Sequence, residues 1–386
     1  MFKNKHYDFS FFLKDGYPLE TRYGTSGQLW GLINELNKRG YKTCIITTPP
    51  IRHKRSILNK LSNTSFFANF LSNKVRRIHL KIDKKYIYKT RYIFLNKKFL
   101  FDSSAKLKLN VKINYLISWN WEAAYNLKKL NTNAHKIQIL HYKYEPENLA
   151  DYLKENELPL FKEMYYQPVD KLAISYTQVN ELKSNYNICL WLQGISTELF
   201  TYDNGKDKKE DITILVPLRN HREKGPEYAI DVMKSIHYLR PEIKIIGYGD
   251  YKGRVPTFIY FKGRVSIEEL IFLYKKASIF VIPSLSEGFS LPGLEAMASG
   301  CVVISTINGG SEQYILDHEN GILVKYGDIE GMSGAILEVV GNNELREKII
   351  RNGLETVKNY TYSKACDRFL EAIKSLECNR KNGCYG

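Results

Sequence analysis

The sequence predicts an α/β protein with two domains, each built on a parallel sheet that helices cover on both faces. Two observations lead to this fold class. In both halves of the chain, short apolar runs alternate with segments of helical periodicity, which is the pattern of parallel sheets. The length of 386 residues also suits two domains rather than one. With 44% hydrophobic and 25% charged residues the chain can bury large cores, which excludes wholesale disorder.

The first half begins its alternation with a helix at residues 26–39. Its apolar residues recur at helical spacing on one face: Leu29, Leu32, Ile33 and Leu36. Gly40 supplies the C-terminal stop, and residues 41–47 then read as a strand. Two later apolar runs, 115–117 and 137–140, predict further strands of the same sheet.

The second half alternates more regularly. Strands are expected at residues 212–216, 243–246, 279–282 and 302–304. One helix opens at Gly225-Pro226, where proline suits a first helical turn, and it carries an apolar face made of Ala229, Val232, Met233 and Ile236. A second helix begins with the capping box Ser266-x-x-Glu269 and ends near Ala277, and a third runs from about Pro292 to just before Gly300.

A polar segment without apolar periodicity, residues 201–211, is expected to link the two domains. The boundaries that follow are an N-terminal domain at 1–200, a C-terminal domain at 212–360 and a final segment at 361–386. No apolar run approaches the ~20 residues that span a bilayer, and the first residues lack the apolar core of a secretion signal. The six cysteines are scattered without a C-x-x-C pair, which argues against a disulfide scaffold or structural zinc and favours a cytoplasmic location.

The charge is uneven along the chain. The formal net charge is +16, and residues 51–112 hold 17 lysines and arginines against only Asp83 and Asp102. Such a surface attracts phosphate lipids, nucleic acid or acidic polymers, or it is simply a solvated face. Aromatic residues interspersed in the same segment favour an anionic membrane surface, which we expect as the partner in preference to nucleic acid.

Residues 283–300 carry the strongest chemical signal. They follow a buried strand and open a helix, and ligands of open α/β sheets bind beyond the carboxyl ends of strands. The N–H groups at the start of this helix would favour a phosphate, and Gly288 allows a close backbone approach. Glu287 and Glu295 could face one site, where a carboxylate accepts hydrogen bonds from a vicinal diol; the alternative is a capped helix with two solvated glutamates.

Two cations, Arg219 and Lys224, follow the strand that ends near Leu218. Placed beyond a strand end, they could neutralise a departing diphosphate; otherwise they are ordinary surface charges. Arg222 is a further candidate. The chain contains no D-x-D pair, the usual carboxylate cluster for a metal-bound diphosphate, so no metal or other cofactor is expected.

These segments together resemble the family-4 (group 1) retaining glycosyltransferases. Glu287 through Glu295 resembles the family's pair of glutamates separated by seven residues. Four other stretches resemble family motifs in the same order: Leu218–Gly225, Ile246–Asp250, Asn320–Asp328 and Gly194–Phe200. In the first half, Gly24–Gly27 occupies the place of a glycine-rich loop, and His141 occupies that of a histidine near the transferred sugar. The loop Gly309–Glu312 is one residue shorter than is usual in the family.

The resemblance implies the GT-B architecture, in which two Rossmann-like domains with parallel sheets face each other across a central cleft. It implies that the C-terminal domain holds a nucleotide sugar, that the N-terminal domain holds a saccharide acceptor, and that a helix near 360–376 crosses back. The resemblance also implies roles for four residues. Arg219 and Lys224 would bind the diphosphate, Glu295 would bind the ribose, and Glu287 would bind the sugar hydroxyls. Further contacts are implied for His141 and for a set of backbone positions: Gly27, Gly288, Phe289, Ser290 and Leu291.

The expected function is metal-independent transfer of a hexose-type sugar, with retention, in cell-surface polysaccharide synthesis such as that of capsule or lipopolysaccharide. The acceptor is expected to be lipid-linked at the inner face of the plasma membrane, where the enzyme would bind peripherally. Three alternatives remain at this stage: a nucleotide-sugar epimerase, another enzyme of the same fold such as a phosphorylase, or a non-enzymatic anion binder that uses residues 51–112.

Overall fold

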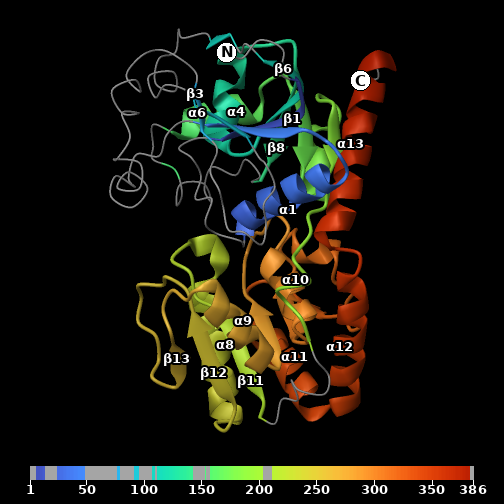
Figure 1. Ribbon diagram of the computed structural model, residues 1–386. Coiled ribbons are helices and arrows are strands. Elements are labelled where there is room, and N and C mark those ends of the chain that lie inside the picture. Colours follow the sequence, from blue (N-terminus) through green and yellow to red (C-terminus); the bar gives the residue numbers. More distant parts are fainter. Residues whose placement is uncertain are drawn as a thin grey trace, which may run out of the picture.

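The computed structural model describes residues 6–13, 24–47, 76–78, 91–94, 107–108, 111–141, 153, 157–202 and 211–382. They form two α/β domains, drawn one above the other in Figure 1, with helix α1 (Gly24–Lys38) where the two meet. The predicted fold class is confirmed. Most of the basic segment 51–112 and most of the expected linker lie outside the described residues.

The N-terminal sheet has the strand order β10-β9-β8-β6-β1-β2-β4-β3. Its strands are β1 (His6–Leu13), β2 (Thr43–Thr47), β3 (Arg76–Ile78), β4 (Arg91–Phe94), β6 (Lys112–Ser118), β8 (His135–Leu140), β9 (Asp170–Ala173) and β10 (Ile188–Leu190). All neighbours are parallel except β3, which runs antiparallel to β4 at the edge, so this sheet is mixed rather than purely parallel. A separate short pair joins β5 (Leu107–Lys108) to β7 (Leu130–Asn131).

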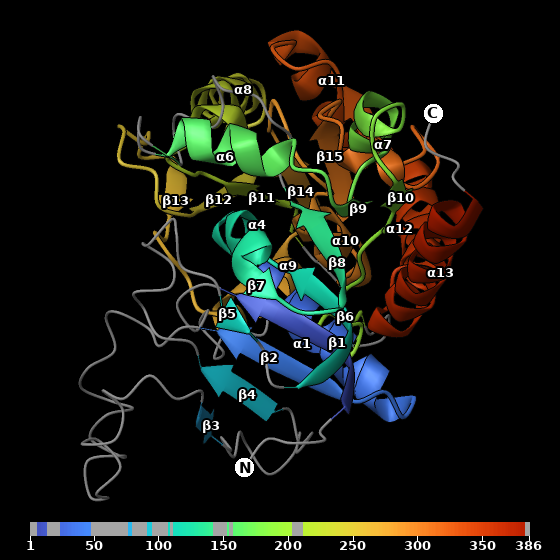
Figure 2. The same ribbon diagram turned by 90° about the horizontal axis from the view of Figure 1, so that it is seen from above.

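Helices cover both faces of this sheet, as Figure 2 shows from above. They are α1, α4 (Trp121–Asn126), the 3-10 turn η1 (Leu127–Lys129), α6 (Leu158–Tyr165) and α7 (Tyr176–Leu182). The apolar face expected for the first helix is buried in α1, and Gly40 adopts φ +87° at its end, as a helix stop requires. The central strand β1 was not expected, because its polar residues alternate irregularly with phenylalanines.

The C-terminal sheet has six parallel strands in the order β13-β12-β11-β14-β15-β16. They are β11 (Thr213–Pro217), β12 (Lys244–Tyr248), β13 (Ile259–Phe261), β14 (Ile279–Ile282), β15 (Val302–Thr306) and β16 (Ile322–Val324). Around them lie the 3-10 turns η2 (Arg222–Lys224) and η3 (Ser311–Gln313) and the helices α8 (Pro226–Leu239), α9 (Ile267–Lys276), α10 (Leu291–Ala298), α11 (Ile329–Gly341) and α12 (Asn343–Val357).

The helices expected here form within a few residues of their predicted bounds. All four apolar residues of the expected α8 face are fully buried. Ser266 caps α9 by accepting the Glu269 N–H at 3.2 Å. A capping box also needs the Glu269 carboxylate to accept the backbone N–H of Ser266. In the structure this carboxylate instead forms an ion pair with Lys262, whose Nζ lies 2.6 Å away.

The last helix, α13 (Tyr362–Asn382), runs from the lower domain along the upper one in Figure 1 and packs against α1 and β10. In the described residues, two segments near the junction of the domains, around Ile195 and Tyr360, lie side by side. Ile195 N–H donates to the Tyr360 carbonyl at 2.7 Å and pairs with Thr361. Arg368 binds both segments through the carbonyls of Leu192, at 3.1 Å, and Asn359, at 2.8 Å.

Candidate active site

The topology explains how distant segments meet. Strands β11 and β14 are parallel neighbours, so the residues that follow them come to the same edge of the sheet. The turn η2 follows β11, and the loop 283–290 follows β14. Leu285 N–H donates to the Glu223 carbonyl at 2.7 Å, which joins the two segments directly.

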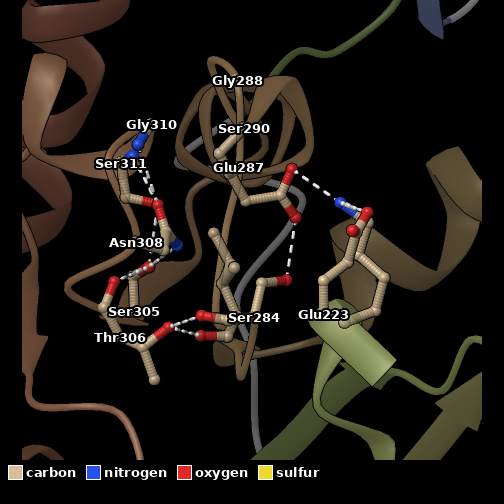
Figure 3. A network of polar contacts seen from close by, with 12 residues as sticks. Glu223, Ser284, Glu287, Gly288, Ser290, Ser305, Thr306, Asn308, Gly310 and Ser311 are labelled. Carbon is tan, nitrogen blue, oxygen red and sulfur yellow. Dashed lines mark hydrogen bonds and ion pairs between the residues drawn. The ribbon is translucent and has the colours of Figure 1, made fainter. Parts of the chain in front are cut away.

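Lys224 and Glu287 are in direct contact at this edge. Lys224 Nζ lies 3.2 Å from Glu287 Oε2 and 3.6 Å from Glu223 Oε1. The other oxygen of Glu287 accepts a hydrogen bond from Ser284 Oγ at 2.8 Å (Figure 3). Two carboxylates therefore already offset the charge of Lys224.

A second loop, residues 307–312 after β15, supports Glu287 from behind. The Glu287 N–H donates to the Asn308 carbonyl at 2.9 Å. Asn308 Oδ1 in turn accepts the N–H groups of Gly310 and Ser311 at 3.0 and 2.9 Å (Figure 3). A Cβ atom on Gly310 would stand 2.8 Å from the Cβ of Glu287 and 3.1 Å from Phe289 N, so only glycine allows the two loops to pack this closely.

The loop of Glu287 continues into α10, whose first turn faces the same edge. Ser290 precedes the helix in the left-handed conformation, with φ 58°, so its side chain does not cap the helix. Within the described residues, the N–H groups of Phe289, Ser290 and Leu291 donate to no other residue. These groups leave a positive potential at the helix start that favours an anion.

Glu295 lies inside α10, with only 6% of its surface exposed. Tyr274 Oη donates to its Oε2 at 3.3 Å. Burial raises the pKa of Glu295 to about 7, although the Tyr274 hydroxyl and the positive charge of Arg219 act in the opposite direction. This carboxyl group therefore titrates near neutral pH.

Arg219 follows β11, and four ionisable side chains act on it electrostatically: Tyr248, Glu287, Tyr274 and Asp250. Enclosure by the protein lowers the pKa of its guanidinium, but Tyr248, Glu287 and neighbouring groups raise it by more. Arg219 thus acts electrostatically on both glutamates of the predicted pair. Arg222 lies in η2, between Arg219 and Lys224.

The N-terminal domain meets this loop at His141, directly after β8. A Cβ atom on Gly288 would lie 3.1 Å from the His141 carbonyl and 2.8 Å from Ile174 Cδ1, so Gly288 packs against the other domain. The imidazole lies against Trp119, with ring centroids 5.0 Å apart. Its two nitrogens and Trp119 Nε1 are buried and hydrogen-bonded to no residue of the described chain.

Burial lowers the pKa of His141 to about 4, against a smaller opposing effect from the Trp119 backbone. The imidazole is therefore neutral at physiological pH, so it can form hydrogen bonds with a ligand but does not supply a positive charge. Gly27 is buried in the first turn of α1. Four residues further along the same helix, Gly31 packs on the Tyr362 ring, and the charge of Glu295 acts on Tyr362.

The structure brings most of the predicted residues together. Arg219, Lys224, Glu287 and Glu295 share the carboxyl edge of the C-terminal sheet, and His141 faces it across the contact at Gly288. Four further residues that contact the site were not predicted: Ser284, Tyr274, Trp119 and Asn308. Tyr274, Trp119 and Asn308 act through contacts with segments that are distant in sequence. Ser284 lies in the same loop as Glu287, and its bond to that carboxylate depends on a loop conformation that no apolar periodicity encodes. In the described part of the chain, no group of three His, Cys, Asp or Glu side chains is placed to hold a metal.

The C-terminal domain matches the group 1 glycosyl transferases. The match to the family model "Glycosyl transferases group 1" covers residues 200–356. An uncharacterized glycosyltransferase of Methanocaldococcus jannaschii, MJ1178, is 32% identical over 150 residues, which are 37% of this chain and 42% of that protein. The chain spans about two fifths to one half of the length of the first curated relatives that it matches.

Solved structures resemble both domains together. Sucrose-phosphate synthase from Thermosynechococcus elongatus has a TM-score of 0.70 at 16% identity, over 97% of this chain and 100% of that one. HepE of Anabaena, solved with UDP and glucose, has a TM-score of 0.66 at 12% identity, over 96% and 100%. At such identities the likeness establishes the fold alone, and that fold is GT-B. The segment that matches this family model contains the four charged residues at the carboxyl edge.

Proposed function

We propose that this chain is a retaining glycosyltransferase that moves a hexose-type sugar from a nucleoside diphosphate sugar to a saccharide acceptor. The observation that carries the proposal is the contact between Lys224 and Glu287 beside the open N–H groups of α10, inside the domain that matches the group 1 family. The Lys224 ammonium group is suited to a diphosphate, and the Glu287 carboxylate is suited to sugar hydroxyls. Neighbours such as HepE, solved with UDP and glucose, support the choice of donor.

The chemistry follows from charge. As the bond between the anomeric carbon and the diphosphate oxygen breaks, negative charge develops on the diphosphate, where Arg219, Lys224 and the α10 N–H groups stabilise it. The acceptor oxygen bonds to the same face of the anomeric carbon, and its proton passes to the departing diphosphate oxygen. No side-chain base is required, which suits a site where the low pKa of His141, about 4, makes its imidazole a weak base. The neutral imidazole hydrogen-bonds to the sugar instead. The remaining contribution of the protein is orientation.

Glu295 gives this proposal a pH signature. A ribose diol donates hydrogen bonds best to an ionised carboxylate, and Glu295 is protonated below its raised pKa of about 7. We expect donor affinity to rise as the pH increases through about 7 and to level off above that pH. Calorimetric titration of a nucleotide sugar at several pH values measures this rise. Glu295→Gln should bind weakly at every pH, without the rise.

The direct test begins with a thermal-shift screen of UDP-, GDP- and dTDP-sugars, since a ligand of the folded state raises the melting temperature. The binding donor is then incubated with saccharide acceptors and the product's anomeric configuration is determined. Retention in the product supports the proposal. A donor sugar that changes without an acceptor would indicate an epimerase, and the absence of any nucleotide-sugar binding would indicate a non-enzymatic anion binder.

We further propose a lipid-linked acceptor at the inner leaflet, in surface-polysaccharide synthesis, with residues 51–112 contacting anionic headgroups. The support is the concentration of positive charge in that segment. No helix in the described part of the chain is long and apolar enough to cross a membrane.

Liposome flotation tests the membrane contact. We expect binding to anionic vesicles at low salt that weakens as salt is added. Reversing four lysines to glutamate should remove this binding: Lys84, Lys85, Lys97 and Lys98. The matched control reverses four exposed cations of the C-terminal domain: Lys252, Arg254, Lys276 and Arg351. Absence of flotation by the unmodified protein at low salt, or equal loss in both variants, would contradict a specific role for this segment.

A further inference from the structure

The two oxygens of Glu295 have different environments. Oε2 accepts the hydrogen bond from Tyr274 Oη at 3.3 Å. Oε1 accepts none from any residue that the structure describes. A carboxylate has about four acceptor positions, so one oxygen is fixed while the other keeps its capacity to bind a ligand.

Tyr274 is built into the core. It is 0% exposed on α9, and its ring packs edge-on against Phe200 and Phe280, with centroid distances of 5.9 and 5.3 Å. A ring held on two sides has no freedom to swing its hydroxyl elsewhere. The Tyr274 hydroxyl is also hydrogen-bonded to the Tyr248 side chain. A phenol carries a single proton, so when Tyr274 donates to Glu295 its oxygen is left to accept from Tyr248.

Few other groups act on Glu295. Arg219 approaches from the segment after β11 and Tyr248 from β12, where it lies beside the Tyr274 hydroxyl. Tyr362 approaches from α13. Arg219 supplies a positive charge but no hydrogen bond to Glu295 in the described structure, so Tyr274 alone fixes the direction of the carboxylate.

We propose that Tyr274 is a positioning residue for donor binding: its buried hydroxyl holds Oε2 of Glu295 so that Oε1 remains free to accept a ribose hydroxyl. The inference rests on the proposed function and deepens it, because it assigns the orientation of the ribose carboxylate to a residue that does not touch the ligand. The same hydrogen bond stabilises the ionised carboxylate. Its loss should therefore raise the pKa of Glu295, whereas a simple loss of packing would not.

The test is Tyr274→Phe, with UDP-glucose as the probe and GDP-glucose and dTDP-glucose titrated in parallel. These diphosphates are esterified at both ends and do not titrate near neutral pH, so the pH dependence belongs to the protein. Affinity is measured calorimetrically from about pH 5 to about pH 9. We expect the midpoint of the rise in affinity to move upward by roughly one pH unit, since one hydrogen bond to a charged group is lost. Near the upper end of the range most of the affinity should return.

Tyr228→Phe is the matched control, because it removes another buried hydroxyl, which donates to the Asp328 carbonyl at 2.9 Å in the same domain. Its midpoint should equal that of the unmodified protein. A Tyr274→Phe profile that is lowered equally at every pH, or that keeps its midpoint, overturns the inference. Failure of the unmodified protein to bind any of the three nucleotide sugars would instead overturn the proposed function.

A second variant guards against misfolding of Tyr274→Phe. Site-specific 3-fluorotyrosine at position 274 keeps the shape of the ring but makes the phenol a more acidic, stronger donor. The inference then requires a shift of the midpoint in the opposite direction, toward lower pH. An unchanged midpoint in this folded variant would also overturn it.

Discussion

Lys224→Ala is expected to lower sugar transfer by roughly 10²–10³-fold, the effect of removing one group that stabilises charge developing in a transition state. Since Lys224 lies 3.2 Å from Glu287, the lysine serves both the diphosphate and the carboxylate that would bind the sugar. Nucleotide-sugar affinity should fall together with turnover. Steady-state kinetics and calorimetry measure the two effects separately.

Glu287→Ala should differ from Lys224→Ala in one respect. It frees Lys224 from one of its two carboxylates, so a nucleoside diphosphate should bind at least as tightly as before while transfer is lost.

Lys234→Ala is the matched control for Lys224→Ala. Lys234 is also paired with a carboxylate, that of Asp231 at 2.9 Å, but it lies on the outer face of α8. Full transfer by both site variants, with circular dichroism unchanged, would refute the assignment of the site.

The second large effect is expected from Gly310→Ala. The added methyl group would stand 2.8 Å from Glu287 Cβ and 3.1 Å from the Glu287 carbonyl, so the two loops must separate. A displacement of about 1 Å at a reacting centre can reduce the rate ~10²-fold, and we expect a loss of that size in turnover. Overpacking of this kind costs about 1–3 kcal/mol, so the melting temperature should also fall by a few degrees.

Gly334→Ala provides the comparison for this prediction. Gly334 lies in α11 with open space around the position of a Cβ, so alanine is accommodated there. Its transfer rate should be unchanged, and its stability should rise slightly because alanine favours a helix over glycine. Unimpaired transfer by Gly310→Ala would show that the position of Glu287 does not depend on the loop after β15.

The charged residues of the site were predictable because they depend on a single rule of topology. Arg219, Lys224 and Glu287 each follow a buried parallel strand, and such strands end at a common edge. Their pairing was not predictable: the sequence placed two cations beyond a strand end, but it did not indicate that Lys224 contacts both Glu223 and Glu287. Distances between residues on neighbouring strands depend on loop conformation, which no apolar period encodes.

The helices and strands that were expected also differ from those that were not in how strongly their sequences repeat apolar residues. Helices α1 and α8 carry strongly periodic apolar faces and form as predicted. The edge strand β3 has three residues, two of them arginine, and gives no periodic signal, so its antiparallel pairing had no basis in the sequence. The expected bond from the Ser266 N–H to the Glu269 carboxylate is absent because Glu269 forms an ion pair with Lys262, which lies outside the helix.

The paired segments near the junction of the domains restrict how the halves can move. Ile195 and Tyr360 are hydrogen-bonded and Arg368 binds both segments, so they behave as a single strap. Sliding one domain past the other would break the hydrogen bonds that join these two segments. Rotation about the segments would need only small changes in backbone torsion angles. We therefore expect the two domains to open by rotation about these residues rather than by sliding, with the largest separation on the side farthest from Arg368.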